Sequence, residues 1–308
     1  MVRCSLLALV ALLLIATAGA GCAGLGTPKT IYLARHGQTS WNRTWRFQGN
    51  PDLDPVGYVN RASLYLLLKD RPIQVIYTSE RLRTRRTAAP LAQAKGLTIR
   101  PRAALNEISP GIFEGMCLAQ LMPQRSTTED RRCLVEARGS RPESTLKQLR
   151  KLAQPFVNDS LETRWPMGQS VVDLDAQVRP FIGELRRNPR DAEVLVVGHG
   201  VVNRVLLRQL MGWSLQSVAK LRQLNDQVYR IEQAGSDQAR LSLYTPGQGW
   251  KACAPPAAGQ QYLDCNPGPP QRTTPTQAPQ EPAPAAEDDT LPPEPESEPT
   301  TEQPGDSD

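Results

Sequence analysis

Only two histidines occur in the 308 residues, and both stand where an imidazole could do chemistry. His36 closely follows the apolar run Thr30–Ala34, and His199 closely follows the apolar run Val194–Val197. Each histidine precedes a glycine, which lets another backbone or a ligand approach closely. A lone histidine at a strand end is usually structural, but two in the same setting indicate a shared site. His36 and His199 are therefore candidate catalytic residues.

Arginines beside these histidines indicate the charge of the ligand. Arg35 adjoins His36, and Arg83 lies at the expected start of a helix. Planar guanidinium donors and helix N-termini both bind phosphate oxygens. The sequence contains neither a P-loop nor a Gly-x-Gly-x-x-Gly fingerprint, so the common nucleotide-cradling loops are absent. These residues predict a nucleophilic imidazole that attacks a phosphorus atom held by cations.

An alternation of strands and helices must position these side chains. Apolar spacing predicts helices over 58–68, 80–94, 171–185 and 201–211. Pro90 could break the second helix, and Ser170 with Asp173 could cap the third. Short apolar runs predict strands at 30–34, 73–77, 97–100 and 194–197, and a hairpin of 227–231 with 240–244. The pattern predicts a three-layer α/β/α sandwich with a mostly parallel central sheet and a C-terminal hairpin. Ligands of such sheets bind beyond the carboxyl ends of the strands.

Composition separates a basic body from an acidic tail. Hydrophobic residues make up 39% and charged residues 22%, which excludes a coiled coil, a multi-span membrane protein and a wholly disordered chain. From Asp264 onward there are 11 acids and one base, and 12 of the 28 prolines follow Asn266. Such a segment cannot bury enough apolar surface to offset chain entropy. We expect a catalytic domain over 28–250, then a cysteine-containing segment and disordered tail over 251–308.

The N-terminus has the layout of an export signal. Arg3 precedes an apolar run from Leu6 to about Ala20, and small residues follow. Residues 1–22 are therefore expected to be a signal peptide that sends the protein to the periplasm or cell envelope. Cys22 after Gly19-Ala20-Gly21 also resembles a bacterial lipoprotein site, and an uncleaved membrane anchor is the remaining alternative. A lipid on Cys22 would be the one membrane contact.

Export would make disulfides the expected state of the four cysteines that follow the signal peptide. An oxidising compartment favours disulfides, and nearest-neighbour pairing would join Cys117 to Cys133 and Cys253 to Cys265. Four cysteines allow three connectivities, so the other two stay open. The sequence has no Cys-x-x-Cys motif or Cys/His cluster, and we expect neither a metal nor another cofactor.

Several sequence blocks together resemble one family. The stretch Leu33–Asn42 is similar to the signature of the histidine phosphatase superfamily, in the branch of phosphoglycerate mutases and related phosphatases. Further matching blocks follow in family order over residues 29–245: Phe47-Gln48-Gly49, Tyr77–Arg83, Leu105-Asn106-Glu107, Phe113-Glu114-Gly115 and Val197–Gly200.

The resemblance implies a role for each candidate. It makes His36 the nucleophile and Glu107 the proton donor to the leaving group. It assigns phosphoryl or substrate contacts to Arg35, Asn42, Gln48, Arg83 and His199. It requires no metal, and it leaves the insertion at about 116–165 as a small helical cap over the site.

Some alternatives remain open within this interpretation. Glu114 is the rival carboxylate to Glu107, whereas Arg81, Arg85 and Arg86 are expected on a solvated helix face. The expected activity is hydrolysis of a small phosphorylated substrate, with no nucleic-acid partner and the oligomeric state left open. The alternatives are phosphoglycerate mutase-type transfer and a phospho-ligand binding protein without turnover.

Overall fold

The computed structural model describes residues 25–121, 133, 141–157, 161–190, 192–257, 260 and 262–266. The expected signal peptide with Cys22 and the expected tail from 267 lie outside the described residues. The described part of the chain belongs to one compact unit that extends to Pro269. No helix of this part is long and apolar enough to cross a membrane.

A seven-stranded mixed sheet forms the centre of the unit, in the order β4-β3-β6-β2-β7-β8-β9. The four strands β4, β3, β6 and β2 run parallel, whereas β7, β8 and β9 are antiparallel to their neighbours. The strands are β2 (Thr30–Arg35), β3 (Ile73–Thr78), β4 (Ile99–Pro101), β6 (Glu193–Gly198), β7 (Val228–Glu232), β8 (Arg240–Thr245) and β9 (Gly249–Ala252). A separate two-stranded pair joins β1 (Leu25–Gly26) to β5 (Asn188–Pro189).

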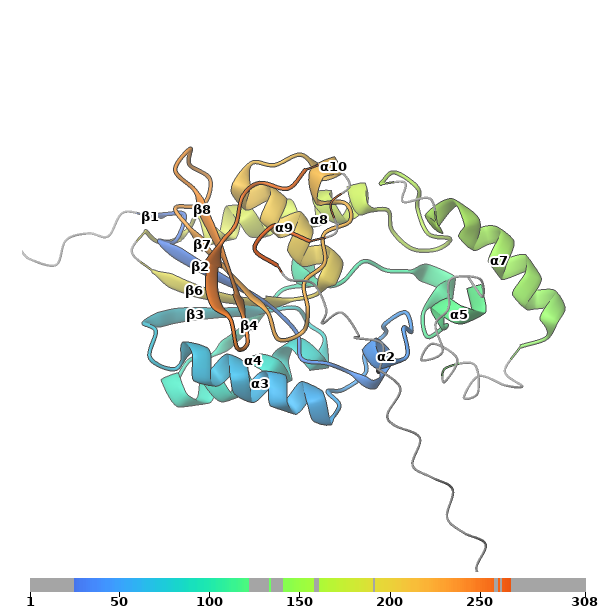
Figure 1. Ribbon diagram of the computed structural model, residues 1–308, viewed down its shortest axis with the longest axis horizontal. Helices are drawn as coiled ribbons and strands as arrows, with labels where there is room; N and C mark the ends of the chain where they lie inside the picture. Colours follow the sequence, from blue (N-terminus) through green and yellow to red (C-terminus); the bar gives the residue numbers. More distant parts are fainter. Residues whose placement is uncertain are drawn as a thin grey trace, which may run out of the picture. The chain divides into compact units, whose positions relative to one another are not determined.

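Helices cover both faces of the sheet, because its central strands are apolar on both sides (Figure 1). Ile31 and Leu33 of β2 pack toward α8 and α9, while Tyr32 and Ala34 pack toward α3 and α4. The covering helices are α3 (Pro55–Leu68), α4 (Leu82–Lys95), α8 (Val171–Leu185) and α9 (Gly200–Met211), with the short α10 (Leu215–Val218) beside α9. The expected three-layer fold class is confirmed.

Local sequence signals explain most helix ends. Helix α3 begins three residues earlier than expected, because Asp54 caps it and Pro55 occupies its first turn. Ser170 and Asp173 form the expected capping box of α8. Pro90 does not break α4, whose buried residues on either side hold it against the sheet. The strand expected at 97–100 starts later, because Gly96 ends α4 in a left-handed conformation and Leu97 still bonds to Ala92.

The expected domain boundary at residue 250 falls inside β9, which the sequence analysis missed. This third antiparallel strand extends the expected hairpin and makes parallel and antiparallel pairings equally frequent. Gly249, the first residue of the strand, has a φ of +75°, which glycine adopts readily. The residues that follow also pack on the body, and Cys253 is joined to Cys265 as expected.

The insertion expected to form a cap contains two described helices, α5 (Leu118–Leu121) and α7 (Glu143–Val157). A small core of its own joins them, with Phe47, Phe113 and Trp165 in ring contact. The expected disulfide between Cys117 and Cys133 is present. Short elements complete the described chain: α2 (Ser40–Arg43), η1 (Ala103–Leu105) and η2 (Gly111–Phe113).

Candidate active site

The two histidines lie side by side, because β2 and β6 are neighbours in register. Arg35 pairs with Gly198 at the ends of these parallel strands, and the backbone N–H of His36 donates to Gly198 O (3.0 Å). The ring centroids of His36 and His199 are 5.1 Å apart. Both rings are buried, with 2% and 0% of the residue exposed. The two histidines therefore meet at the sheet edge where parallel strands end, which is where ligands of such sheets bind.

His36 is held as a neutral imidazole with one free nitrogen. Its Nδ1 lies 2.7 Å from Gly37 O, and a carbonyl only accepts, so Nδ1 carries the proton and Nε2 keeps its lone pair. Burial, followed by the charges of Arg83 and Arg35, holds the pKa of His36 well below its usual value. A neutral imidazole with Nε2 unprotonated is the form that can attack an electrophile.

Close packing fixes the loop that carries His36. The N–H of Gly37 donates to Thr87 Oγ1 of α4 (2.9 Å). A Cβ on Gly37 would lie 2.5 Å from the carbonyl oxygen of Gly57 in α3, so only glycine fits there. The loop is therefore held between α3 and α4, the two helices that cover one face of the sheet. This packing limits movement of the His36 imidazole.

Arg83 is the most deeply buried cation of the site, at 1% exposed. It comes from the first turn of α4 and donates from Nη1 to Gly49 O (2.7 Å) and from Nη2 to His199 Nδ1 (3.1 Å). Burial lowers the pKa of Arg83 to about 10, and the charge of Glu107 opposes that effect. The guanidinium therefore stays charged at neutral pH.

His199 is occupied at both ring nitrogens. Its Nδ1 accepts from Arg83, so Nε2 carries the proton and donates to Ser79 Oγ (2.7 Å). Burial, and then the charge of Arg83, holds the pKa of His199 well below its usual value. The neutral ring thus orients the Arg83 guanidinium, and its Nε2–H reaches a ligand only by leaving Ser79.

Ser79 is a member of the site that the sequence analysis did not single out. It is fully buried and lies 2.8 Å from the hydroxyl of Thr84. It directly follows β3, at the same sheet edge where His36 follows β2 and His199 follows β6. That common position was the signal that could have identified it.

Arg35 and Glu107 both lie beside Gly200 at the start of α9. Arg35 donates from Nη1 to Gln223 O (2.8 Å), and burial lowers its pKa while the charge of Glu107 acts in the opposite direction. The Glu107 carboxylate accepts from the N–H groups of Val201 and Val202, 3.1 Å each, at the start of α9. A helix N-terminus carries positive partial charge, so it suits a carboxylate.

The side chains of Asn42 and Gln48 both form hydrogen bonds with Thr39. Asn42 Oδ1 accepts from the Thr39 N–H (3.0 Å) and completes the capping box of α2. Gln48 Oε1 accepts from Thr39 Oγ1 (3.2 Å). Asn42 therefore has a local structural role in addition to the contact expected from the sequence.

Three buried donors at this site lack a hydrogen-bond partner among the described residues. They are Arg35 Nε, Arg83 Nε and Gln48 Nε2. Buried donors are nearly always satisfied in folded proteins. All three belong to residues expected to contact the phosphoryl group or the substrate, and all three require an acceptor. An anion is the ligand that such a set of donors fits.

The rival residues are placed differently. Glu114 is exposed, and a Cβ on Gly49 would lie 2.5 Å from its Oε1, so it lies over the loop that holds Arg83. Arg86 pairs with Asp52 (3.2 Å) and Arg85 is exposed, as expected for a solvated helix face. The described residues contain no cluster of three His, Cys, Asp or Glu side chains that could hold a metal.

Comparisons with known proteins agree with this geometry. The family model described as histidine phosphatase superfamily (branch 1) matches residues 31–154 and 132–245. A probable phosphoglycerate mutase, GpmB, of Shigella boydii is 29% identical over 204 residues, which cover 66% of this chain and 84% of that protein. GpmB proteins of Escherichia coli match equally well.

Solved structures show the same fold. A mycobacterial glucosyl-3-phosphoglycerate phosphatase in complex with VO3 aligns with a TM-score of 0.53 at 20% identity, over 75% of this chain and all of that one. A putative alpha-ribazole-5'-P phosphatase of Escherichia coli gives 0.54 at 18% identity, over 75% and 97%. Because the family model spans most of the chain and the two histidines meet at one sheet edge, the protein belongs to branch 1 of the histidine phosphatase superfamily.

Proposed function

We propose that the protein is a phosphatase that hydrolyses small phosphomonoesters through a phosphohistidine on His36. The observation that carries this proposal is the pairing of a free imidazole nitrogen with three unsatisfied buried donors. The relatives support it at the general level, since the solved structures of similar fold include proteins named as phosphatases.

The reaction would proceed in two steps. His36 Nε2 attacks phosphorus, the bond from phosphorus to the ester oxygen breaks, and Glu107, in its protonated form, gives its proton to the departing alcohol and becomes a carboxylate. A water molecule then attacks phosphorus, the bond to Nε2 breaks, and Glu107 takes the proton of the water as inorganic phosphate forms.

Cations would stabilise the charge that develops on the phosphoryl oxygens. Arg35 and Arg83 are aimed by Gln223 O and by His199, so little reorganisation is needed during the reaction. Gln48 would contribute its free amide N–H. Asn42 and His199 remain predicted contacts, each of which would have to share or exchange its present partner. This scheme uses only side chains of the chain and no cofactor.

The test is hydrolysis of p-nitrophenyl phosphate by the mature protein beside its His36→Ala variant. Turnover that depends on His36 supports the proposal, whereas phosphate binding without turnover supports the phospho-ligand binding alternative. The mutase alternative has support in the name of the GpmB relatives. Incubation with 3-phosphoglycerate separates the two, because a mutase yields an isomer and a phosphatase yields free phosphate.

We also propose that the protein is exported, with residues 1–22 as the signal and with lipidation of Cys22 left to experiment. The two disulfides of the body support this proposal, because such bonds persist in oxidising compartments. Mass spectrometry of the mature N-terminus from membrane and soluble fractions tests it. An intact Met1 on a cytosolic product would contradict it.

A further inference from the structure

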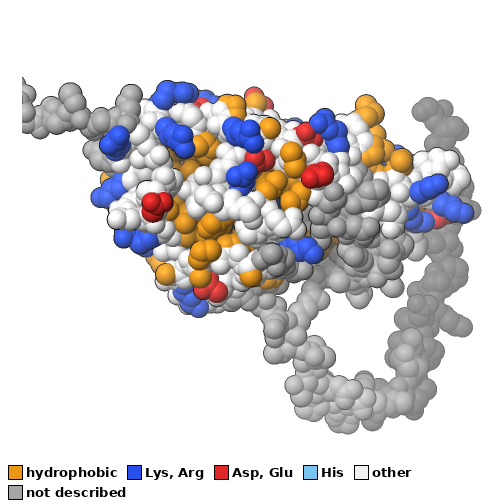
Figure 2. All heavy atoms as spheres, turned by 90° about the horizontal axis from the view of Figure 1, so that it is seen from above, with side chains coloured by type: hydrophobic (Ala, Val, Ile, Leu, Met, Phe, Trp, Pro, Cys, Tyr) orange, Lys and Arg blue, Asp and Glu red, His pale blue; other side chains and the backbone are white. Residues whose placement is uncertain are grey.

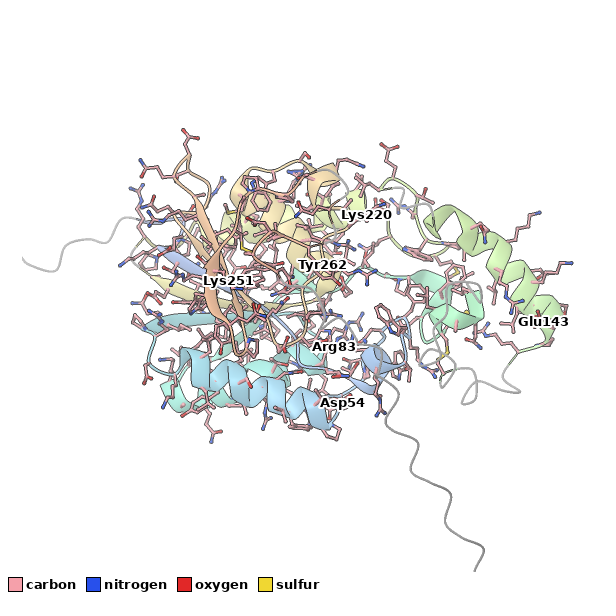
Figure 3. All side chains as sticks on the ribbon, viewed as in Figure 1. Asp54, Arg83, Glu143, Lys220, Lys251 and Tyr262 are labelled. Carbon is pink, nitrogen blue, oxygen red and sulfur yellow. A yellow bond between two sulfur atoms is a disulfide. The ribbon has the colours of Figure 1, made fainter. Side chains whose placement is uncertain are left out.

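The chain continues beyond the region that the family model matches, and this extension contacts a loop beside the active site. The family model ends at residue 245. The described residues that follow β9 are 253–257, 260 and 262–266, and we call them the C-terminal strap. Tyr262, labelled in Figure 3, belongs to the strap.

The strap is fastened to the body at both ends. The N–H of Cys253 donates to Leu241 O of β8 (2.9 Å), and the disulfide joins Cys253 to Cys265. Leu263 and Cys265 are buried in the core that α8 and α9 share with the sheet. These contacts therefore fix the position of Asn266, the last described residue of the strap.

Asn266 holds the loop between α10 and β7, residues 219–227, from two sides. Its Nδ2 donates to Arg222 O and to Gln227 Oε1, 3.2 Å each. Its Oδ1 accepts from Gln227 Nε2 (2.9 Å). Asn266 is 6% exposed and Gln227 is 1% exposed, so these bonds are shielded from water.

The same loop touches both residues at the end of β2. Gln223 O accepts from Arg35 Nη1 (2.8 Å), and Asn225 Nδ2 donates to His36 O (2.6 Å). Gln223 is itself held, because its Nε2 donates to Leu33 O (2.9 Å) and Gln227 O (3.0 Å). Hydrogen bonds thus run from Asn266 through Gln227 and Gln223 to Arg35, and Asn225 of the same loop bonds to the backbone of His36.

We propose that Asn266 is a positioning residue of the active site, held in place by the Cys253–Cys265 disulfide. It acts through the 219–227 loop, which aims the Arg35 guanidinium and fixes the backbone at His36. This inference rests on the proposed function for its kinetic readout. Its physical basis is that small errors in the placement of a catalytic group strongly reduce the rate.

The experiment compares Asn266→Ala and Asn266→Asp with Gln260→Ala in the full mature protein. Aspartate keeps the acceptor for Gln227 but cannot donate to Arg222 O. Gln260 is the matched control, because its side-chain oxygen accepts from Ala257 within the strap. The measurements are kcat and KM for p-nitrophenyl phosphate, the affinity for inorganic phosphate by calorimetry, and the folded fraction by circular dichroism.

Both Asn266 variants are expected to lower kcat about 10- to 100-fold in the folded fraction, with a smaller change in KM and weaker phosphate binding. Gln260→Ala should match the wild type. A strap that serves stability alone would lower the melting temperature and leave kcat and phosphate affinity of the folded protein unchanged, and this result overturns the proposal.

A second variant covers the case in which Asn266 substitutions do not fold. Replacing Cys253 and Cys265 together by serine frees the strap without touching the 219–227 loop, and should lower kcat and phosphate affinity in the same direction. Unchanged values there, in a folded protein, also overturn the proposal. If the wild type turns over no phosphomonoester, the proposed function fails, and phosphate affinity alone still decides the role of Asn266.

Discussion

Two polar regions of the molecule lie at opposite ends of the sheet and differ in kind. One is the active-site cluster of His36, His199, Arg35 and Arg83 at the carboxyl end of β2. The other is a groove beside Glu232, which pairs with Thr30 at the amino end of β2. Helix α9 connects them, since it begins after His199 and ends at Met211 beside the groove.

The groove has a volume of about 870 Å³, and its charges are paired. Arg240 and Arg230 lie 3.7 and 4.0 Å from the Glu232 carboxylate, and Arg230 also stacks on Trp250. Arg230 Nε lacks a hydrogen bond, but its guanidinium has both of these partners. In the active-site cluster the unpartnered donors come from two arginines and a glutamine around a neutral imidazole. The regions differ because three such donors gather beside a neutral imidazole in the cluster, whereas the single one among the described residues of the groove belongs to a guanidinium that faces a carboxylate.

The same contrast holds at the surface. The face over α8 and α9 shows more Lys and Arg than Asp and Glu in Figure 2, as expected for a basic body. Each exposed cation contributes little to the stability of the fold or to the binding of an anion, because water and salt screen its charge. The cations that matter for the proposed chemistry are the buried ones, Arg35 and Arg83.

The largest expected effect is that of removing the proposed nucleophile. His36→Ala should lower kcat/KM for p-nitrophenyl phosphate at least about 10⁴-fold, since no other group at the site can form the covalent intermediate. Rapid quenching with labelled substrate should place phosphorus on His36 in the wild type. Label on another residue would move the chemistry away from this site.

Replacing Arg83 by lysine should have the next largest effect. An ammonium group cannot satisfy Gly49 O and His199 Nδ1 while also presenting a donor to phosphate, as the guanidinium does. We expect a loss of about 10²- to 10³-fold in kcat. Arg86→Lys, on the solvated face of the same helix, is the control. Equal activity of both variants would show that burial of Arg83 has no catalytic value.

The two neutral histidines should make the fold sensitive to acid. Their pKa values in the folded protein lie well below the ordinary 6.5, so the unfolded chain binds more protons below that pH. Stability should therefore be full above pH 6.5 and fall as the pH falls, by up to about 1.4 kcal/mol per histidine and pH unit. Urea unfolding at pH 7.5 and 5.5 measures this, and His199→Gln should show a weaker dependence. An identical dependence in that variant would contradict a buried neutral His199.

The smallest effect is expected in the groove. Arg240 is largely exposed and paired, so Arg240→Ala should leave kcat/KM within about twofold of the wild type. The assay is the same as for His36→Ala. A loss comparable to that of Arg83→Lys would mean that the groove and the active-site cluster are energetically coupled.

The sequence predicted the central strands and the long helices because their signals are local. Alternate apolar residues of β2 face opposite layers, and the capping box at Ser170 lies within four residues. Strand β9 was missed because Trp250 and its neighbours are half-exposed or exposed and give no apolar run.

Part of the site was predicted as well. The five candidate residues converge in the structure. Arg83 bonds to His199, the charges of Arg83 and Arg35 act on His36, and the charge of Glu107 acts on Arg83. The residues that hold them were not predicted. Ser79 could have been identified from its position directly after β3, whereas Gln223, Asn225 and Asn266 are polar loop residues whose local sequence indicates no partner.

The sequence by itself determined which residue types are available for chemistry and which strands carry them, because hydrophobic periodicity and glycine placement act over a few residues. Only the tertiary structure decided that both ring nitrogens of His199 have partners, and that the strap holds the loop beside Arg35. Those outcomes depend on contacts between distant residues, 116 and 120 positions apart at His199 and 44 positions apart between Arg222 and Asn266. Such contacts form when packed layers bring loops together, and no local pattern records them.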